Sequence, residues 1–81
     1  MPSSFYAKID DRGRITLAKG AFYSCETVGF SADIKKRIVH IFRGGRYPVD
    51  SRRRVFVPAD IRRSLGLAAG SYVNIIERGV A

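Results

Sequence analysis

The fold is decided by one segment in the second half of the chain, Val49-Asp50-Ser51-Arg52-Arg53-Arg54-Val55-Phe56-Val57. A related segment stands 40 residues earlier, Ile9-Asp10-Asp11-Arg12-Gly13-Arg14-Ile15-Thr16-Leu17, with aspartate, two arginines and three aliphatic residues at equivalent places. A second match follows in the same order, because Val39-His40-Ile41-Phe42 resembles Val73-Asn74-Ile75-Ile76 at an offset of 34 residues. Two matches in order indicate an internal repeat of two units, about residues 5–43 and 46–78.

The apolar pattern predicts that each unit consists mostly of strands. Residues 5–9 alternate between core-type and surface-type side chains, which is the period of a half-buried strand. Turns are expected at residues 10–13 and 50–53, because aspartate hydrogen-bonds to nearby backbone groups and Gly13 tolerates a positive φ. Arg53 stands where Gly13 would be, so the second turn is either of a different type or strained.

One short helix is predicted, with about two turns between Pro58 and Leu65. Proline suits the first helical turn, where its missing N–H is harmless, and Asp60 favours the positive end of the helix dipole. Ile61 and Leu65 fall on one face, and Gly66 provides a left-handed end. A helix this short needs packing against the rest of the chain.

Length and composition bound the architecture. The chain has 81 residues, of which 46% are hydrophobic, which allows one domain with a core over residues 1–81. Neither unit alone has enough apolar surface for a core, and the first unit has no equally clear helix. We therefore predict a mostly β fold, a small barrel with pseudo-two-fold symmetry, in which closure removes exposed strand edges.

From Val49 to Leu67 the sequence resembles an AbrB-type (SpoVT/AbrB) DNA-binding unit, and counterparts of the family pattern extend over residues 47–77. These are the Val-Asp pair, the turn arginine, a short aliphatic strand ending in proline, an Ile-Arg-Arg helix and Leu-Gly-Leu. The first unit resembles the family through residues 9–17. The paired arrangement is similar to the tandem-unit, MraZ-type members. The resemblance implies a swapped-hairpin (cradle-loop) barrel of ββαβ units that binds DNA through arginines.

The resemblance implies particular site residues. By position, Arg54 and Arg14 match the turn arginine of the two units, and Arg62 and Arg63 match the arginine pair of the helix. Arg53 replaces the turn glycine, and Ser71 replaces the aspartate of the family's Gly-Asp turn. Because the first unit has no Arg-Arg helix, we expect the two halves to bind DNA differently. On the helix, the two arginines are expected to point away from the apolar stripe.

Charge points to the same region. The formal net charge is +8, and every basic residue after His40 is an arginine, which can contact phosphates and guanine edges bidentately. The candidate DNA-binding residues are therefore Arg12, Arg14, Arg52, Arg53, Arg54, Arg62 and Arg63. We expect Asp10 and Asp50 to brace their turns by accepting backbone hydrogen bonds.

Other function classes lack their chemistry in this sequence. Cys25 and His40 are the single cysteine and histidine, so no metal set, intrachain disulfide or catalytic constellation can be assembled, and Cys25 is expected in the core. We expect no enzyme, no cofactor and no small-molecule substrate. No apolar run is long enough to span a bilayer, and the start lacks the pattern of a signal peptide, which favours a cytoplasmic, nucleoid-associated location.

The preferred hypothesis is thus a transcriptional regulator that binds duplex DNA, acting as a monomer, a homodimer or a higher oligomer. Two alternatives remain open: a barrel that binds an acidic protein partner, and a protein that binds RNA or single-stranded nucleic acid. Tyr6, Tyr23, Tyr47 and Tyr72 could stack on bases in the latter case. Their alternation with aliphatic residues favours partial burial in the core instead.

Overall fold

The computed structural model describes residues 3–19 and 26–80, with side chains from 4 to 19 and from 26 to 78. Its elements are β1 (Ser3–Lys8), β2 (Arg14–Thr16), β3 (Thr27–Asp33), β4 (Ile38–Arg43), β5 (Tyr47–Pro48), β6 (Arg54–Phe56), α1 (Ala59–Leu65) and β7 (Tyr72–Val80). The prediction of a mostly β fold with one clear short helix is confirmed. The expected core position of Cys25 lies outside the described residues.

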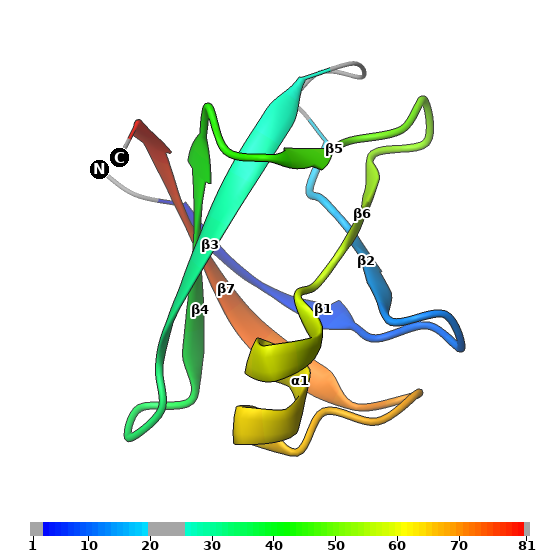
Figure 1. The fold of residues 1–81 in the computed structure, drawn as a ribbon, viewed down its shortest axis with the longest axis vertical. Helices are drawn as coiled ribbons and strands as arrows, with labels where there is room; N and C mark the ends of the chain where they lie inside the picture. The colour runs from blue at the N-terminus through cyan, green and yellow to red at the C-terminus, as the bar shows by residue number, and fades with distance from the viewer. Residues whose placement is uncertain (1–2, 20–25, 81) are drawn as a thin grey trace.

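The strands form two sheets that together enclose the core (Figure 1). Five strands lie in the order β1-β7-β4-β3-β5, and this curled sheet forms a half-barrel. Its neighbours are antiparallel except for β4 and β7, which run parallel. The two remaining strands, β2 and β6, pair antiparallel as a separate ribbon. The result is a small, barrel-like fold.

Burial follows the paired positions of the internal repeat. Every aliphatic position that the repeat pairs is buried in both units, with at most 4% of the residue exposed: Ile9 and Val49, Ile15 and Val55, Leu17 and Val57, Val39 and Val73, Ile41 and Ile75. These side chains belong to one cluster. Because each unit contributes half of a shared core, neither half buries its apolar face without the other.

The ribbon shows the pseudo-two-fold relation most directly. Ile15 of β2 lies opposite Val55 of β6, and these residues are equivalent in the repeat. The backbone bonds beyond the strands are equivalent too. The N–H of Leu17 donates to the carbonyl of Arg53 at 2.7 Å, and the N–H of Val57 donates to that of Gly13 at 3.0 Å. The pseudo-symmetry axis therefore passes through the centre of the ribbon.

The two units differ between their second strand and their last. The second unit carries α1 there, whereas the first unit carries β3, which pairs with both β4 and β5. The helix begins after Pro58 and ends at Gly66, whose φ of +63° is left-handed, as the sequence predicts. Residues 32 and 33 end β3, and residues 34–37 form the β3–β4 turn.

Leu65 anchors α1, because it is the helix residue that is buried, with 2% of its surface exposed. We expect Leu65→Ala to lower the free energy of unfolding by about 2–5 kcal/mol, through lost apolar burial and a residual cavity. Ser64→Ala, at an exposed position of the same helix, should change it by less than about 0.5 kcal/mol. Urea unfolding measures both, and equal effects would contradict this packing.

Candidate nucleic-acid interface

Two turns of identical construction flank the ribbon. In the first, Asp10 Oδ1 accepts the backbone N–H groups of Arg12 (2.9 Å) and Arg14 (2.8 Å), and its Oδ2 accepts Arg14 Nε at 2.8 Å. In the second, Asp50 makes the same three bonds to Arg52 and Arg54, at 2.9, 2.8 and 2.8 Å. The bracing role expected of the two aspartates is confirmed, and each also holds an arginine.

These bonds lower the pKa of both carboxyl groups below the ordinary value for aspartate. For Asp10, partial desolvation raises the pKa but is outweighed by the backbone N–H groups of Arg14 and Arg12 and by the Arg14 guanidinium. For Asp50, the backbone N–H of Arg54 is the largest cause, acting against desolvation together with the Arg54 guanidinium and the N–H of Arg52. Both carboxylates are consequently charged at neutral pH and hold their turns closed.

The outer face of the ribbon carries arginine and an aromatic ring. Arg14 lies opposite Phe56, and Thr16 lies opposite Arg54. Because Ile15 and Val55 between them point into the core, these four side chains share the opposite face. The Arg14 guanidinium lies 5.8 Å from the centre of the Phe56 ring, and half of Phe56 is exposed. The ribbon thus presents a pseudo-symmetric surface with an arginine from each unit.

Arg53 and Arg62 each donate a hydrogen bond to the carbonyl that follows a strand of the ribbon, one in each unit. Arg62 Nε donates to the carbonyl of Val57 at 3.0 Å, and its side chain lies over Gly13, where a Cβ would meet Nη1 at 2.6 Å. At the equivalent place in the first unit, Arg53 Nε donates to the carbonyl of Leu17 at 3.2 Å. An arginine at the turn position therefore bonds the strand end in one unit, while the helix arginine does so in the other.

This arrangement settles two expectations. The second turn is strained rather than of a different type, because Arg53 has a left-handed φ of +62° and yet keeps the hydrogen bonds of the first turn. Arg62, which was expected to point away from the Ile61/Leu65 stripe, is not fully exposed. Its side chain is half-buried against the first turn, because the absent side chain of Gly13 leaves room for it. Arg63 is exposed, as expected.

The candidate arginines therefore fall into two groups. Arg12, Arg52 and Arg63 are exposed and have no side-chain partner among the described residues. The others are held by a carboxylate or a backbone carbonyl: Arg14, Arg53, Arg54 and Arg62. The segment 50–54 holds three arginines and one aspartate, whereas the segment 10–14 holds two of each charge, so the positive charge is greater at the second turn.

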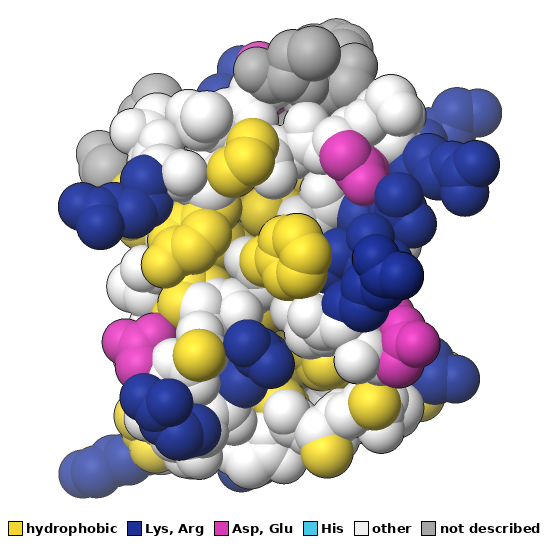
Figure 2. Space-filling model, turned by 45° about the vertical axis from the view of Figure 1, so that its right-hand side comes forward, with side chains coloured by type: hydrophobic (Ala, Val, Ile, Leu, Met, Phe, Trp, Pro, Cys, Tyr) yellow, Lys and Arg dark blue, Asp and Glu magenta, His cyan; other side chains and the backbone are white. Residues whose placement is uncertain are grey.

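Figure 2 brings forward the side of the molecule that carries the ribbon in Figure 1. Hydrophobic side chains gather at the centre of this face. Lysine and arginine side chains form a group along its right-hand edge, between two acidic side chains, and further basic groups lie toward the left. The face is therefore mixed, with cations around an apolar centre.

Two exposed tyrosines and one exposed basic turn were not expected from the sequence. Tyr6 and Tyr72 are 73% and 65% exposed, so the expectation that the tyrosines are partly buried is wrong for these two. It is confirmed for Tyr47, which packs edge-on against Phe30, while Tyr23 lies outside the described residues. Lys35, Lys36 and Arg37 lie in an exposed turn between β3 and β4. Three consecutive basic residues are the sequence signal that could have identified this turn.

Metal and membrane chemistry find no support within the described ranges. No group of three His, Cys, Asp or Glu residues among them could hold a metal ion. No helix in the same part of the chain combines the length and apolar character needed to cross a bilayer. Comparison with protein-family models, with curated proteins and with solved structures finds no match.

The contact between Gly13 and Arg62 can be tested by adding one methyl group. We expect Gly13→Ala to destabilise the fold more than Gly70→Ala, by about 0.5–1.5 kcal/mol, because the Arg62 guanidinium must move and lose its bond to the Val57 carbonyl. Gly70 is the matched control: its φ of +89° is close to the +82° of Gly13, and nothing lies within 4 Å of its added Cβ. Backbone strain alone costs about 1–2 kcal/mol.

Urea unfolding of the double variant isolates the clash. In an Arg62→Ala background, the extra cost of Gly13→Ala should vanish, leaving a penalty like that of Gly70→Ala. An undiminished penalty in that background would show that Arg62 is not the group displaced.

The lowered pKa values of Asp10 and Asp50 predict a loss of stability in acid. Their folded pKa lies below the unfolded value, so their contribution is fully present above about pH 4 and is lost as the pH falls through the folded pKa. Thermal unfolding followed from neutral pH downward measures this. Asp50→Asn should reduce the loss, whereas Asp11→Asn, at an exposed neighbouring position, should leave it unchanged. Parallel pH profiles for both variants would contradict the assignment.

Proposed function

We propose that this protein is a non-enzymatic DNA-binding protein, a transcriptional regulator of AbrB-like, swapped-hairpin type, that binds duplex DNA with the ribbon and its two turns. The observation that carries the proposal is the outer face of β2 and β6, where two equivalent units present Arg14 and Arg54 beside turns tipped by Arg12 and Arg52. A nucleoid-associated location in the cytoplasm follows from the same proposal.

The shape of the ribbon supports this reading. The major groove of B-DNA admits a two-stranded β-ribbon, and ribbon proteins read bases with side chains from one strand face. Here the face available for such contacts holds Arg14, Thr16, Arg54 and Phe56, while the opposite face is fixed in the core. A rigid ribbon loses little conformational entropy on binding.

The hydrogen-bond partners of the arginines support two different roles in DNA binding. The exposed Arg12, Arg52 and Arg63 are suited to phosphates, because their guanidinium groups have no side-chain partner to leave among the described residues. Arg14 and Arg54 each use Nε on a carboxylate, which leaves their terminal nitrogens as further donors in a fixed position. The carboxylates of Asp10 and Asp50 reduce the net attraction of Arg14 and Arg54 for DNA. We therefore propose that these two arginines orient the protein on the DNA more than they contribute to affinity.

The turn arginines are the direct test. Arg12→Ala with Arg52→Ala should lower duplex affinity at least tenfold at low salt and reduce the slope of log K against log salt by about 2, since each lost phosphate contact reduces it by about 0.9. Fluorescence anisotropy with a labelled duplex across a salt series measures both. Lys35→Ala with Lys36→Ala is the matched control, because it removes two exposed cations from a different turn.

Circular dichroism and thermal unfolding should show that both double variants remain folded, since the four substituted side chains are exposed. Equal losses of duplex affinity in the two double variants would mean that net charge, rather than the ribbon, determines binding. Absence of duplex binding by the unmodified protein at low salt would refute the proposal outright. Retention of an acidic protein in that case would favour the interaction-module alternative.

A further inference from the structure

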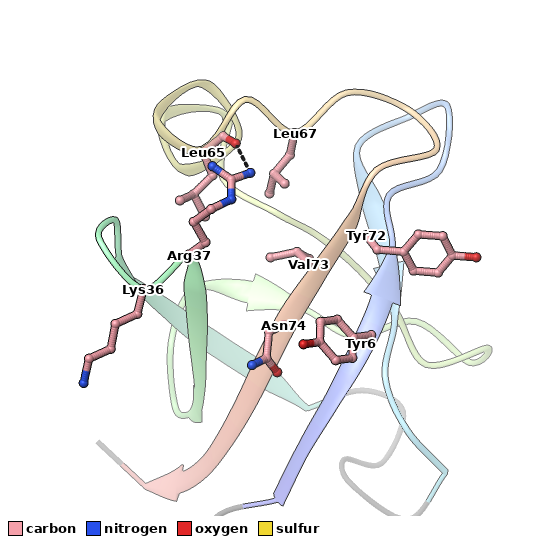
Figure 3. A pocket seen from close by; sticks show the side chains of 8 residues that line it. All are labelled: Tyr6, Lys36, Arg37, Leu65, Leu67, Tyr72, Val73 and Asn74. Atoms are coloured by element: carbon pink, nitrogen blue, oxygen red, sulfur yellow. Dashed lines mark hydrogen bonds between the residues drawn. The ribbon is translucent and has the colours of Figure 1, made fainter.

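A pocket of about 200 Å³ lies where four parts of the fold meet: the end of α1, the β3–β4 turn, β1 and β7 (Figure 3). Leu65 and Leu67 contribute apolar surface from the end of the helix, and Lys36 and Arg37 come from the turn. Tyr6, Tyr72 and Asn74 complete it from the two strands. The pocket belongs to the five-stranded sheet and is separate from the ribbon.

Tyr6 and Tyr72, here called the tyrosine platform, are exposed on the outer face of this sheet, with rings that point in different directions (Figure 3). Tyr6 lies opposite Asn74 and Lys8 lies opposite Tyr72, so the two tyrosines are diagonal neighbours with Cα atoms about 7–8 Å apart. Figure 3 shows them projecting from the adjacent strands β1 and β7. With 73% and 65% of their surface exposed, Tyr6 and Tyr72 are both accessible to a ligand.

Cations border this platform. Lys8 shares the face of the two tyrosines, and Lys36 and Arg37 of the β3–β4 turn line the pocket, with the Lys36 amine pointing away from the tyrosines (Figure 3). Arg37 Nη2 donates to the carbonyl of Leu65 at 2.7 Å, which fixes the turn to the end of α1 (Figure 3). Asp33 is the acidic residue of this turn, and its Oδ1 accepts the backbone N–H of Lys36 at 3.1 Å. Positive charge therefore dominates the border.

We propose that this pocket and the tyrosine platform bind unpaired nucleotides of a single-stranded nucleic acid. Bases would stack on Tyr6 and Tyr72, while Lys8 and the β3–β4 turn neutralise the phosphates. Exposed aromatic rings on a sheet, bordered by lysine and arginine, are the combination by which proteins bind single strands without strong sequence preference. In a duplex the base faces are covered by their neighbours, so this platform requires an unpaired strand.

The chemistry favours a nucleic acid over an acidic peptide. Carboxylates of a peptide would satisfy the cations but would leave both tyrosine rings uncovered. A nucleotide strand uses both features, because each unit carries one negative charge and one aromatic base. This inference is independent of duplex binding at the ribbon, since the residues and the sheet are different.

Tyrosine fluorescence provides the test, because the chain has four tyrosines and no tryptophan. A short oligothymidylate should quench the emission and bind with an affinity that Tyr6→Leu with Tyr72→Leu lowers at least tenfold, as expected for the loss of stacked bases. Tyr6→Phe with Tyr72→Phe keeps both rings and should retain the affinity, measured by anisotropy of the labelled strand. Both tyrosines are exposed, so these variants are expected to fold.

Two further variants separate this site from the ribbon. Lys35→Ala with Lys36→Ala should weaken oligothymidylate binding several-fold, whereas Arg12→Ala with Arg52→Ala should leave it within about twofold. Arg37 is left unchanged because its side chain holds the turn. Oligothymidylate should bind much more tightly than thymidine monophosphate, since several contacts act together along a strand.

Three results would overturn the proposal. The first is oligothymidylate affinity that is unchanged by the leucine substitutions. The second is equal affinity for the monophosphate and the strand, which would assign the pocket to a free nucleotide. The third is polyglutamate that binds more tightly than oligothymidylate and is indifferent to both tyrosines, which would assign the surface to an acidic peptide.

Discussion

The structure depends on the pairing of two equivalent strands, β2 and β6, about a pseudo-two-fold axis. Ile15 and Val55 lie opposite each other at the centre of the ribbon and are buried in the shared core. The carboxylates of Asp10 and Asp50 hold the turns that precede the two strands. The same pairing that buries one face exposes the other. Stability and the proposed DNA-binding surface therefore originate from one element.

The backbone of the ribbon follows the pseudo-two-fold symmetry, whereas the side chains around it do not. Gly13 of the first turn leaves room for the side chain of Arg62 from the helix. Arg53, at the equivalent place in the second turn, has a left-handed φ and donates to the carbonyl of Leu17. Leu17 belongs to the first unit, which has β3 where the second unit has α1. The left-handed Arg53 supplies a hydrogen bond to Leu17 of the first unit, which has no helix arginine to make it. Arginines that look alike in the sequence thus divide into structural and exposed groups, and the second turn carries more positive charge.

The sequence predicts the backbone of this fold well, because the repeat consists of residues with strong preferences for buried strands, turns or helix ends. Paired aliphatic positions identify the core, the Asp-x-x-x-Arg spacing identifies the braced turns, and Pro58 and Gly66 bound the helix. The environment of long side chains is harder to predict. Whether Arg62 faces water or packs over Gly13 depends on contact between distant segments, and Tyr6 and Tyr72 are exposed because their strand face has no covering layer.

The central claim, that the outer face of the ribbon is where this protein meets duplex DNA, is tested most directly by ¹⁵N NMR titration of the unmodified chain with a short duplex. The account predicts that the largest shifts occur at the side-chain Nε–H groups of Arg14 and Arg54 and at the amides of both braced turns, while the β3–β4 turn is little affected. Shifts centred on the β3–β4 turn, with the ribbon unchanged, would contradict it.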